Sequence, residues 1–175
     1  MTFFRIAGAL AAMAIATGAA SAQGGAKPTD PQIAHIAYTA GQIDIDAAKQ
    51  ALAKSKNKQI RAFAQDMERD HTAVNKKALA LVKKLKVTPE DNDTSKALVK
   101  QAKDKRAELA KLNGAAFDKA YIDNEVAYHK TVDGALENTL IPSASNSELK
   151  DLLQTGLKIF QGHEQHAEQV AAKVK

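Results

Sequence analysis

Histidine and acidic residues recur at helical spacing in this chain of 175 residues. Glu125 and His129 lie four residues apart, which places both side chains on one face of a helix. Imidazole together with carboxylate is a suitable donor set for zinc, iron, copper or nickel. The residues that we predict as ligands of a transition-metal ion are Asp44, His71, Glu125, His129 and His163.

The sequence lacks the patterns of several other chemistries. It has no cysteine, which excludes a thiolate nucleophile, a cysteine-ligated metal and a disulfide. It has no phosphate-binding glycine-rich loop, no nucleophile elbow and no His-Glu-x-x-His zinc motif. A diiron site would need Glu-x-x-His on two helices, whereas only Glu68 and His71 have that spacing. Because no catalytic set is complete, an enzyme is the less favoured interpretation.

Long helices must position these side chains. The chain is rich in Ala, Leu, Lys, Gln and Glu, which favour helices, and no stretch alternates for long enough to predict a strand. Thr88-Pro89 predicts a helix start, Pro142 a helix end, and Ser145 with Glu148 a capping box that opens the last helix. The predicted helices cover residues 31–54, 58–86, 90–112, 115–140 and 146–173.

These lengths and short connections predict an all-α domain over residues 31–175, built as an antiparallel four-helix bundle. Helix 90–112 is the exception, because Lys105 interrupts its apolar stripe. We predict it as an extra connecting helix, partly exposed and packed across the bundle.

Regular stripes on the other helices define the predicted core. In helix 58–86 the stripe is Ile60, Ala64, Met67, His71, Val74, Ala78, Leu81 and Leu85, at alternating steps of four and three. In helix 146–173 it is Leu149, Leu152, Gly156, Ile159, His163, Ala167, Val170 and Val174. In helix 115–140 it is Ile122, Glu125, His129, Val132 and Leu136.

The two hairpins bring the candidate ligands to one level. A turn near residue 56 places His71 within a helical turn of Asp44. A turn near residue 143 places His163 beside Glu125, with His129 one turn away. Buried polar groups are costly unless something pairs with them. A second interpretation stays open, in which each histidine is a neutral core residue hydrogen-bonded to a tyrosine, an acid or the backbone.

The beginning of the chain predicts export. Residues 1–22 carry one positive charge and an apolar run, and they end in Ala20-Ser21-Ala22, the small-x-small pattern of signal peptidase sites. We predict a signal peptide over 1–22 and a flexible leader over 23–30. The mature chain has no other stretch long enough to span a membrane. This pattern predicts a location in the periplasm or the cell envelope.

The charge of the chain bears on its partners. The formal net charge is +5, and the lysines are spread through the helical segments. That distribution is typical of a solvated surface with weak attraction to anionic groups. The expected partners are an anionic envelope surface or another envelope protein, and export makes nucleic acid an unexpected one.

Three segments resemble a known bacterial family. They are "FAQDMERDHTAVN" (63–75), "LNGAAFDKAYIDNEVAYHKTV" (112–132) and the helix around His163. They resemble the family called domain of unknown function 4142, over about residues 31–173. The Asp-His-x-x-x-Asn pattern matches at Asp70, His71 and Asn75. The resemblance implies a ferritin-like helical fold and an exported protein. Members are often labelled predicted outer membrane proteins, and the family has no established activity.

Two functions follow as expectations. The first is a non-catalytic envelope module that binds a partner, an anionic surface or a small ligand and has a role in stress tolerance. The second is a metal-binding or redox bundle with an internal histidine and carboxylate site. The geometry of the five candidate ligands separates the two, because imidazole nitrogens near a common point favour metal.

Overall fold

The computed structural model describes residues 27–174, in which all regular secondary structure is helical. The all-α class is therefore confirmed. The predicted signal peptide and the first part of the predicted leader lie outside the described residues. The long helices are α1 (Asp30–Lys54), α2 (Lys58–Lys84), α3 (Asp93–Ala110), α4 (Gly114–Ala135) and α6 (Ser147–Ala171). A π-helical turn, η1 (Leu136–Leu140), and the short α5 (Ile141–Ser143) extend α4.

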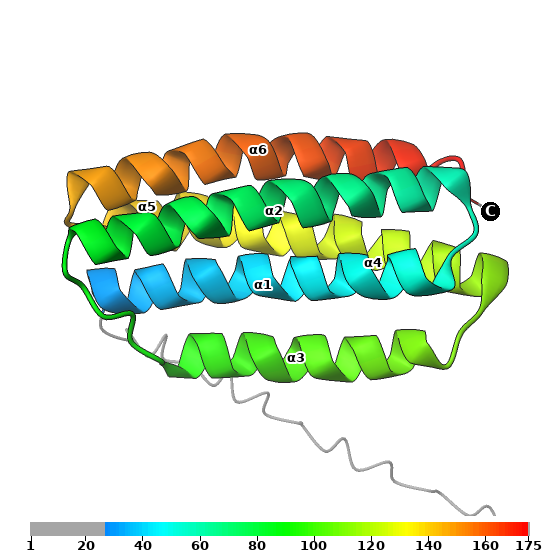
Figure 1. Ribbon diagram of the computed structural model, residues 1–175, viewed down its shortest axis with the longest axis horizontal. Helices are drawn as coiled ribbons and strands as arrows, with labels where there is room; N and C mark the ends of the chain where they lie inside the picture. Colours follow the sequence, from blue (N-terminus) through cyan, green and yellow to red (C-terminus); the bar gives the residue numbers. More distant parts are fainter. Residues whose placement is uncertain (1–26, 175) are drawn as a thin grey trace, which may run out of the picture.

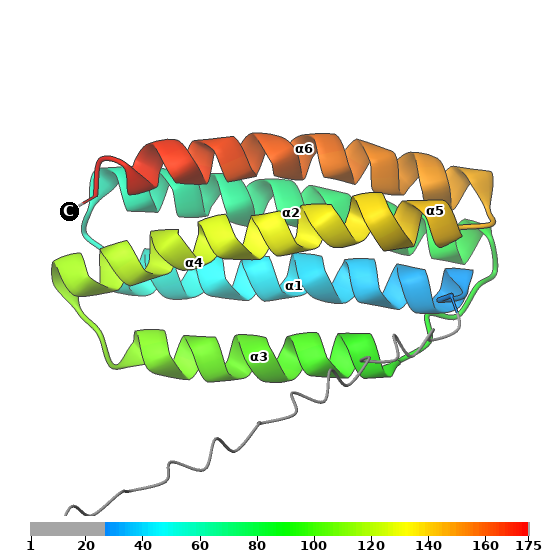
Figure 2. The same ribbon diagram turned by 180° about the vertical axis from the view of Figure 1, so that it is seen from behind.

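Four of the helices lie side by side, and α3 lies outside them (Figures 1 and 2). Helices α1 and α2 form one antiparallel hairpin, and α4 and α6 form another. Helix α3 runs along α1 and returns the chain to the end of the molecule where α4 begins. It is the predicted connecting helix, although it follows α1 rather than crossing the bundle. The relation to ferritin stays a prediction.

Two helices begin within three residues of the predicted starts, but asparagines cap them in place of the predicted residues. Helix α3 begins after Asn92, whose side chain accepts from the Ser95 N–H at 3.0 Å, so Pro89 lies in the connection before it. Helix α6 begins after Asn146, whose side chain accepts from the Leu149 N–H at 3.0 Å. An asparagine side chain satisfies these free backbone donors as well as a serine or threonine does.

The helix predicted to end at Pro142 ends one residue later, at Ser143. The helix passes through η1 and continues to Ser143. Proline lacks the N–H that an α-helix uses at each position. In η1 the Ile141 N–H donates to the Leu136 carbonyl, five residues back, and this wider turn accommodates the proline without ending the helix.

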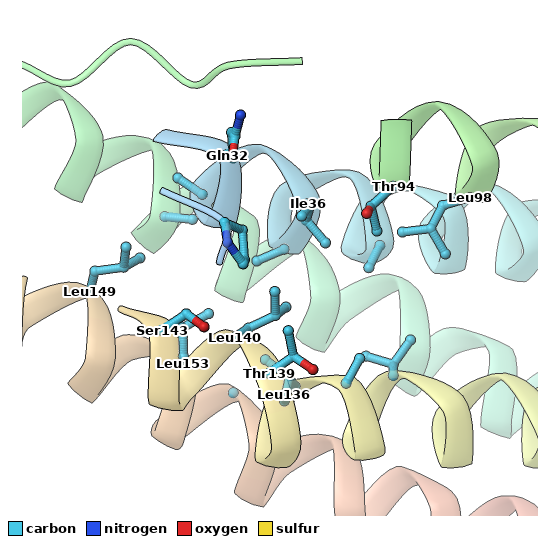
Figure 3. Close-up of a pocket in the computed structure, with 18 of the residues that line it drawn as sticks. Gln32, Ile36, Thr94, Leu98, Leu136, Thr139, Leu140, Ser143, Leu149 and Leu153 are labelled. Carbon is cyan, nitrogen blue, oxygen red and sulfur yellow. The ribbon is translucent and has the colours of Figure 1, made fainter. Parts of the chain in front are cut away.

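Two apolar clusters fill the two ends of the molecule differently. We call the first the packed cluster, and its fully buried members include Ile60, Phe63, Met67, Phe117, Tyr121 and Ile122. We call the second the open cluster, and it includes Ile33, Ile36, Leu136, Leu140, Leu149, Leu153 and Phe160. The open cluster surrounds a cavity of about 760 Å³ lined by α1, α2, α3, α6 and the end of α4 with η1 and α5 (Figure 3).

Several buried residues of the open cluster differ from those of the predicted apolar stripes. Leu153 and Phe160 are buried on α6 in place of Leu152 and Ile159. On α2 the predicted core residues Val74, Ala78, Leu81 and Leu85 are only half-buried. They lie beyond the tightly packed region, where Val74 and Ala78 border the cavity.

Candidate metal centre

A buried polar layer separates the packed cluster from the open cluster. Each helix around the centre contributes to it at its own core stripe. Asp44 comes from α1, His71 from α2, Glu125 and His129 from α4, and His163 from α6. All five residues are at most 7% exposed. The structure therefore brings together all five residues that the sequence singled out.

The three imidazole rings face one another. Their centroids are 5.3 Å apart for His71 and His163, 5.6 Å for His129 and His163, and 5.8 Å for His71 and His129. One ring nitrogen from each lies within 4.8 Å of the other two. This spacing allows a single ion to contact all three rings.

The carboxylates of Asp44, on α1, and Glu125, on α4, lie beside the three imidazoles. Asp44 Oδ2 lies 3.1 Å from His71 Nε2 and 3.3 Å from His129 Nε2. Asp44, Glu125 and His129 form a second group whose ligand atoms lie within 4.8 Å of one another. His129 belongs to both groups, so the two donor sets are adjacent.

Hydrogen bonds outside the group orient two of the rings. His129 Nδ1 donates to the Glu125 backbone carbonyl at 3.0 Å, and His163 Nε2 donates to Asp70 Oδ2 at 3.0 Å. The opposite nitrogens, His129 Nε2 and His163 Nδ1, are buried without a hydrogen bond to any described residue. Metal-bound histidines commonly use one nitrogen for the ion and the other for an oxygen acceptor.

Other buried atoms in the layer are unpaired as well. Neither nitrogen of His71 and neither oxygen of Asp44 has a hydrogen-bond partner among the described residues. The 3.1 Å contact between them is close, but it lacks the alignment of a hydrogen bond. Buried polar atoms in proteins are nearly always satisfied. A cation bound to one nitrogen of His71 and one oxygen of Asp44 would satisfy an atom of each residue.

The electrostatics keep His129, His163 and Asp44 in the protonation states that bind a metal ion. Burial lowers the pKa of His129, and burial lowers the pKa of His163 to about 4, so both rings are neutral at neutral pH. Burial opposes ionisation of Asp44, but the nearby imidazoles, His71 first, outweigh it and lower its pKa. Burial and the charge of Asp44 raise the pKa of Glu125 well above its usual range. Without a cation, Asp44 is therefore the charged carboxylate and Glu125 the protonated one.

Sequence reasoning missed two acidic residues beside the layer. Asp70 holds His163, and Arg69 fixes Asp70 through a 2.7 Å ion pair. Asp133 lies one turn beyond His129 on α4, with both carboxylate oxygens buried and unpaired among the described residues. Burial and the neighbouring Glu164 raise the pKa of Asp133 to about 7. The four-residue steps from Glu125 through His129 lead to Asp133, a signal that the predicted stripe through Val132 overlooked.

Asn75 explains another part of the sequence pattern. It donates from its side-chain amide to the Tyr38 carbonyl at 3.3 Å and joins α2 to α1. A Cβ at Gly41 would collide with Asn75 Oδ1, so glycine permits this close approach. The contact holds the two helices together next to Asp44 and His71.

The sequence comparisons give the class of protein. The family model "Domain of unknown function (DUF4142)" matches residues 15–170, and the chain belongs to this family. No curated protein and no solved structure matches the sequence. None of the helices described here combines the length and apolar character needed to cross a bilayer.

Proposed function

We propose that the protein binds a divalent transition-metal ion in the buried polar layer. His71, His129 and His163 supply the nitrogen ligands, Asp44 supplies a charged oxygen ligand, and Glu125 is a second carboxylate beside His129. One observation carries this proposal. Three buried imidazoles present nitrogens within 4.8 Å of one another. Two of the rings, His129 and His163, each donate one nitrogen to an oxygen outside the group, which leaves the other nitrogen free for an ion.

The alternative of three ordinary core histidines explains this arrangement less well. A neutral core histidine is expected to pair its polar atoms with neighbouring groups. Here both nitrogens of His71 and one nitrogen each of His129 and His163 are buried and unpaired among the described residues. Leaving several such atoms together is costly. An ion bound to one nitrogen of each ring removes the cost at three of these atoms.

The donor set favours particular metals. Imidazole and carboxylate suit zinc, iron, copper and nickel in their divalent states, and the absence of cysteine disfavours ions that prefer soft sulfur ligands. Magnesium and calcium prefer sets made of oxygen alone. Zinc is therefore a suitable test ion, and cobalt is a coloured substitute for it.

Export and envelope binding belong to the same proposal. The signal-like residues 1–22 support a protein that meets its ion outside the cytoplasm. The net charge of +5 supports weak attachment to an anionic envelope surface. Retention on anionic liposomes at low but not at high salt is the expected result. A chain that does not bind them at low salt would contradict this part of the proposal.

The metal site is tested by a matched pair of histidine variants on α6. His163→Gln removes a proposed ligand, whereas His166→Gln removes a histidine that packs against Phe63 outside the layer. We expect wild type and His166→Gln to bind one equivalent of cobalt or zinc in spectroscopic titration and calorimetry. We expect His163→Gln to bind at least about 100-fold more weakly. Equal affinity in the two variants, or no binding by wild type, would contradict the proposal.

A further inference from the structure

The cavity in the open cluster has the size of a ligand site. Its volume is about 760 Å³. Small-molecule pockets occupy about 300–1,000 Å³, whereas close-packed interiors contain few voids larger than a water molecule. Leu98 of α3, Leu140 of η1 and Leu153 of α6 surround one common space (Figure 3). The space is open to solvent, because lining residues such as Thr94 and Thr139 are exposed, so a ligand can enter it.

Small residues keep the cavity open. Ala37 and Ala40 of α1, Ala78 of α2 and Gly156 of α6 all line it. A Cβ at Gly156 would meet only ring atoms of Phe160, at 3.5 Å and beyond, which is ordinary van der Waals contact. Packing therefore does not require glycine at this position. A larger side chain at any of these positions would occupy volume that the present sequence leaves free.

The walls of the cavity indicate the chemistry of its occupant. The lining is mostly aliphatic, with Phe160 and several uncharged polar residues, and among the described residues it includes two charged ones, Lys27 and Asp93, of opposite sign. Both are exposed, so a charged group buried among the aliphatic side chains would lack a partner. Thr139 is an uncharged polar residue of the lining, and its hydroxyl can hydrogen-bond to a neutral polar group (Figure 3).

The wall formed by α4, η1 and α5 gives the length of the cavity. Its lining residues run from Thr131 to Ser143. At 1.5 Å per residue this stretch is about 18 Å long, which suits an extended hydrocarbon chain better than a single ring. We propose that the cavity binds one neutral lipid-like molecule, with its hydrocarbon chain between the helices and its uncharged polar end near the exposed Thr139.

The cavity also touches the polar layer. Phe160 lines the cavity, and its ring stacks on His71 with centroids 4.5 Å apart and planes 7° apart. The lipid-like molecule and the metal ion would therefore share one aromatic wall. Lipid binding uses residues of the open cluster and does not depend on the ion, so each proposal can fail without the other.

The binding test uses N-phenyl-1-naphthylamine, a neutral fluorescent probe, with the protein as purified. We expect saturable binding of one probe per chain. Monopalmitoylglycerol should displace it at concentrations at least about tenfold lower than palmitate or hexadecyltrimethylammonium, because only the neutral molecule avoids burying a charge. Probe binding that does not saturate, or a charged chain that displaces the probe as well as the neutral one, would overturn the proposal.

Cavity-filling variants locate the binding. Ala37→Phe and Ala78→Phe place a ring in the cavity, and the matched control Ala53→Phe places one at an exposed position of α1. The two filling variants should keep or raise the thermal midpoint and should weaken probe binding at least about tenfold, as expected when the occupied volume is lost. The control should bind as wild type does. Equal binding by all three variants would overturn the proposal.

A photolabelling experiment on wild type covers the case in which the filling variants do not fold. A monoacylglycerol that carries a diazirine in its chain is expected to label peptides within residues 131–143 and 149–160, which contain much of the lining. Labelling confined to other helices would contradict the assignment.

Discussion

The packed cluster and the open cluster lie largely on the same helices, yet they are packed differently. In the packed cluster, Phe63, Met67 and Tyr121 are completely buried. In the open cluster, small residues and one glycine surround about 760 Å³ of space. The polar layer lies at the boundary. A rigid interior on one side can hold ligand side chains in place, and an open interior on the other can admit a small molecule. The difference teaches that the bundle is not one uniform core.

The largest expected effect compares the same substitution in the two clusters. Ile122→Ala removes a side chain that is 0% exposed in the packed cluster, and Ile36→Ala removes one that is 6% exposed in the open cluster. We expect Ile122→Ala to lower the free energy of unfolding by about 4 kcal/mol and Ile36→Ala by about 2 kcal/mol, because the second side chain already borders empty space. Urea unfolding of both variants measures the difference. Equal losses would show that the clusters are packed alike.

A smaller effect tests whether Asp70 orients His163 in the polar layer. Asp70→Asn replaces the carboxylate that accepts from His163, whereas Asp66→Asn changes a carboxylate that contacts Arg69 alone. We expect Asp70→Asn to weaken zinc binding by about 10- to 100-fold, as is typical when a partner outside the ligand shell is lost. Asp66→Asn should keep the wild-type affinity. Calorimetry on both variants decides the point, and a matching loss in Asp66→Asn would assign the effect to Arg69 instead.

The smallest expected effect is the pH dependence of stability in chelator-treated protein. Burial lowers the pKa of His163 to about 4 in the folded chain, while an exposed histidine titrates near 6.5. Between these values the unfolded chain binds more protons, so the free energy of unfolding falls as the pH falls from about 6.5 towards 4. His163→Gln should flatten this slope in denaturant titrations at several pH values. A slope that does not change in the variant would contradict neutral burial of this ring.

Most of the helices and the polar layer could be predicted from the sequence. Good helix formers and regular stripes locate each long helix, and short connections set the level of each hairpin to within a turn. That precision was enough to predict that Asp44, His71 and His163 lie close together, because each lies on the buried face of its helix. The family pattern drew attention to Asp70 but could not show that it contacts His163, since that contact joins residues 93 positions apart.

The errors arise where local choices are nearly equal in energy. Leu152 and Leu153, like Ile159 and Phe160, lie on adjacent lines of one helix face, so the stripe could not choose between them. Thr88 and Asn92 are both good caps, and only the folded chain shows that Asn92 is used. The cavity could not be predicted at all, because its volume depends on the separation of helices far apart in the sequence.

The most direct test of the central claim is X-ray absorption spectroscopy of the zinc-loaded protein. We predict that nitrogen and oxygen atoms surround the zinc at about 2.0–2.1 Å, with the multiple-scattering signature of three imidazoles. The same spectrum is expected for His166→Gln, and the imidazole signature is expected to weaken in His163→Gln. A wild-type protein that retains no zinc, or whose zinc shows no imidazole scattering, would contradict the claim that the buried layer is a metal site.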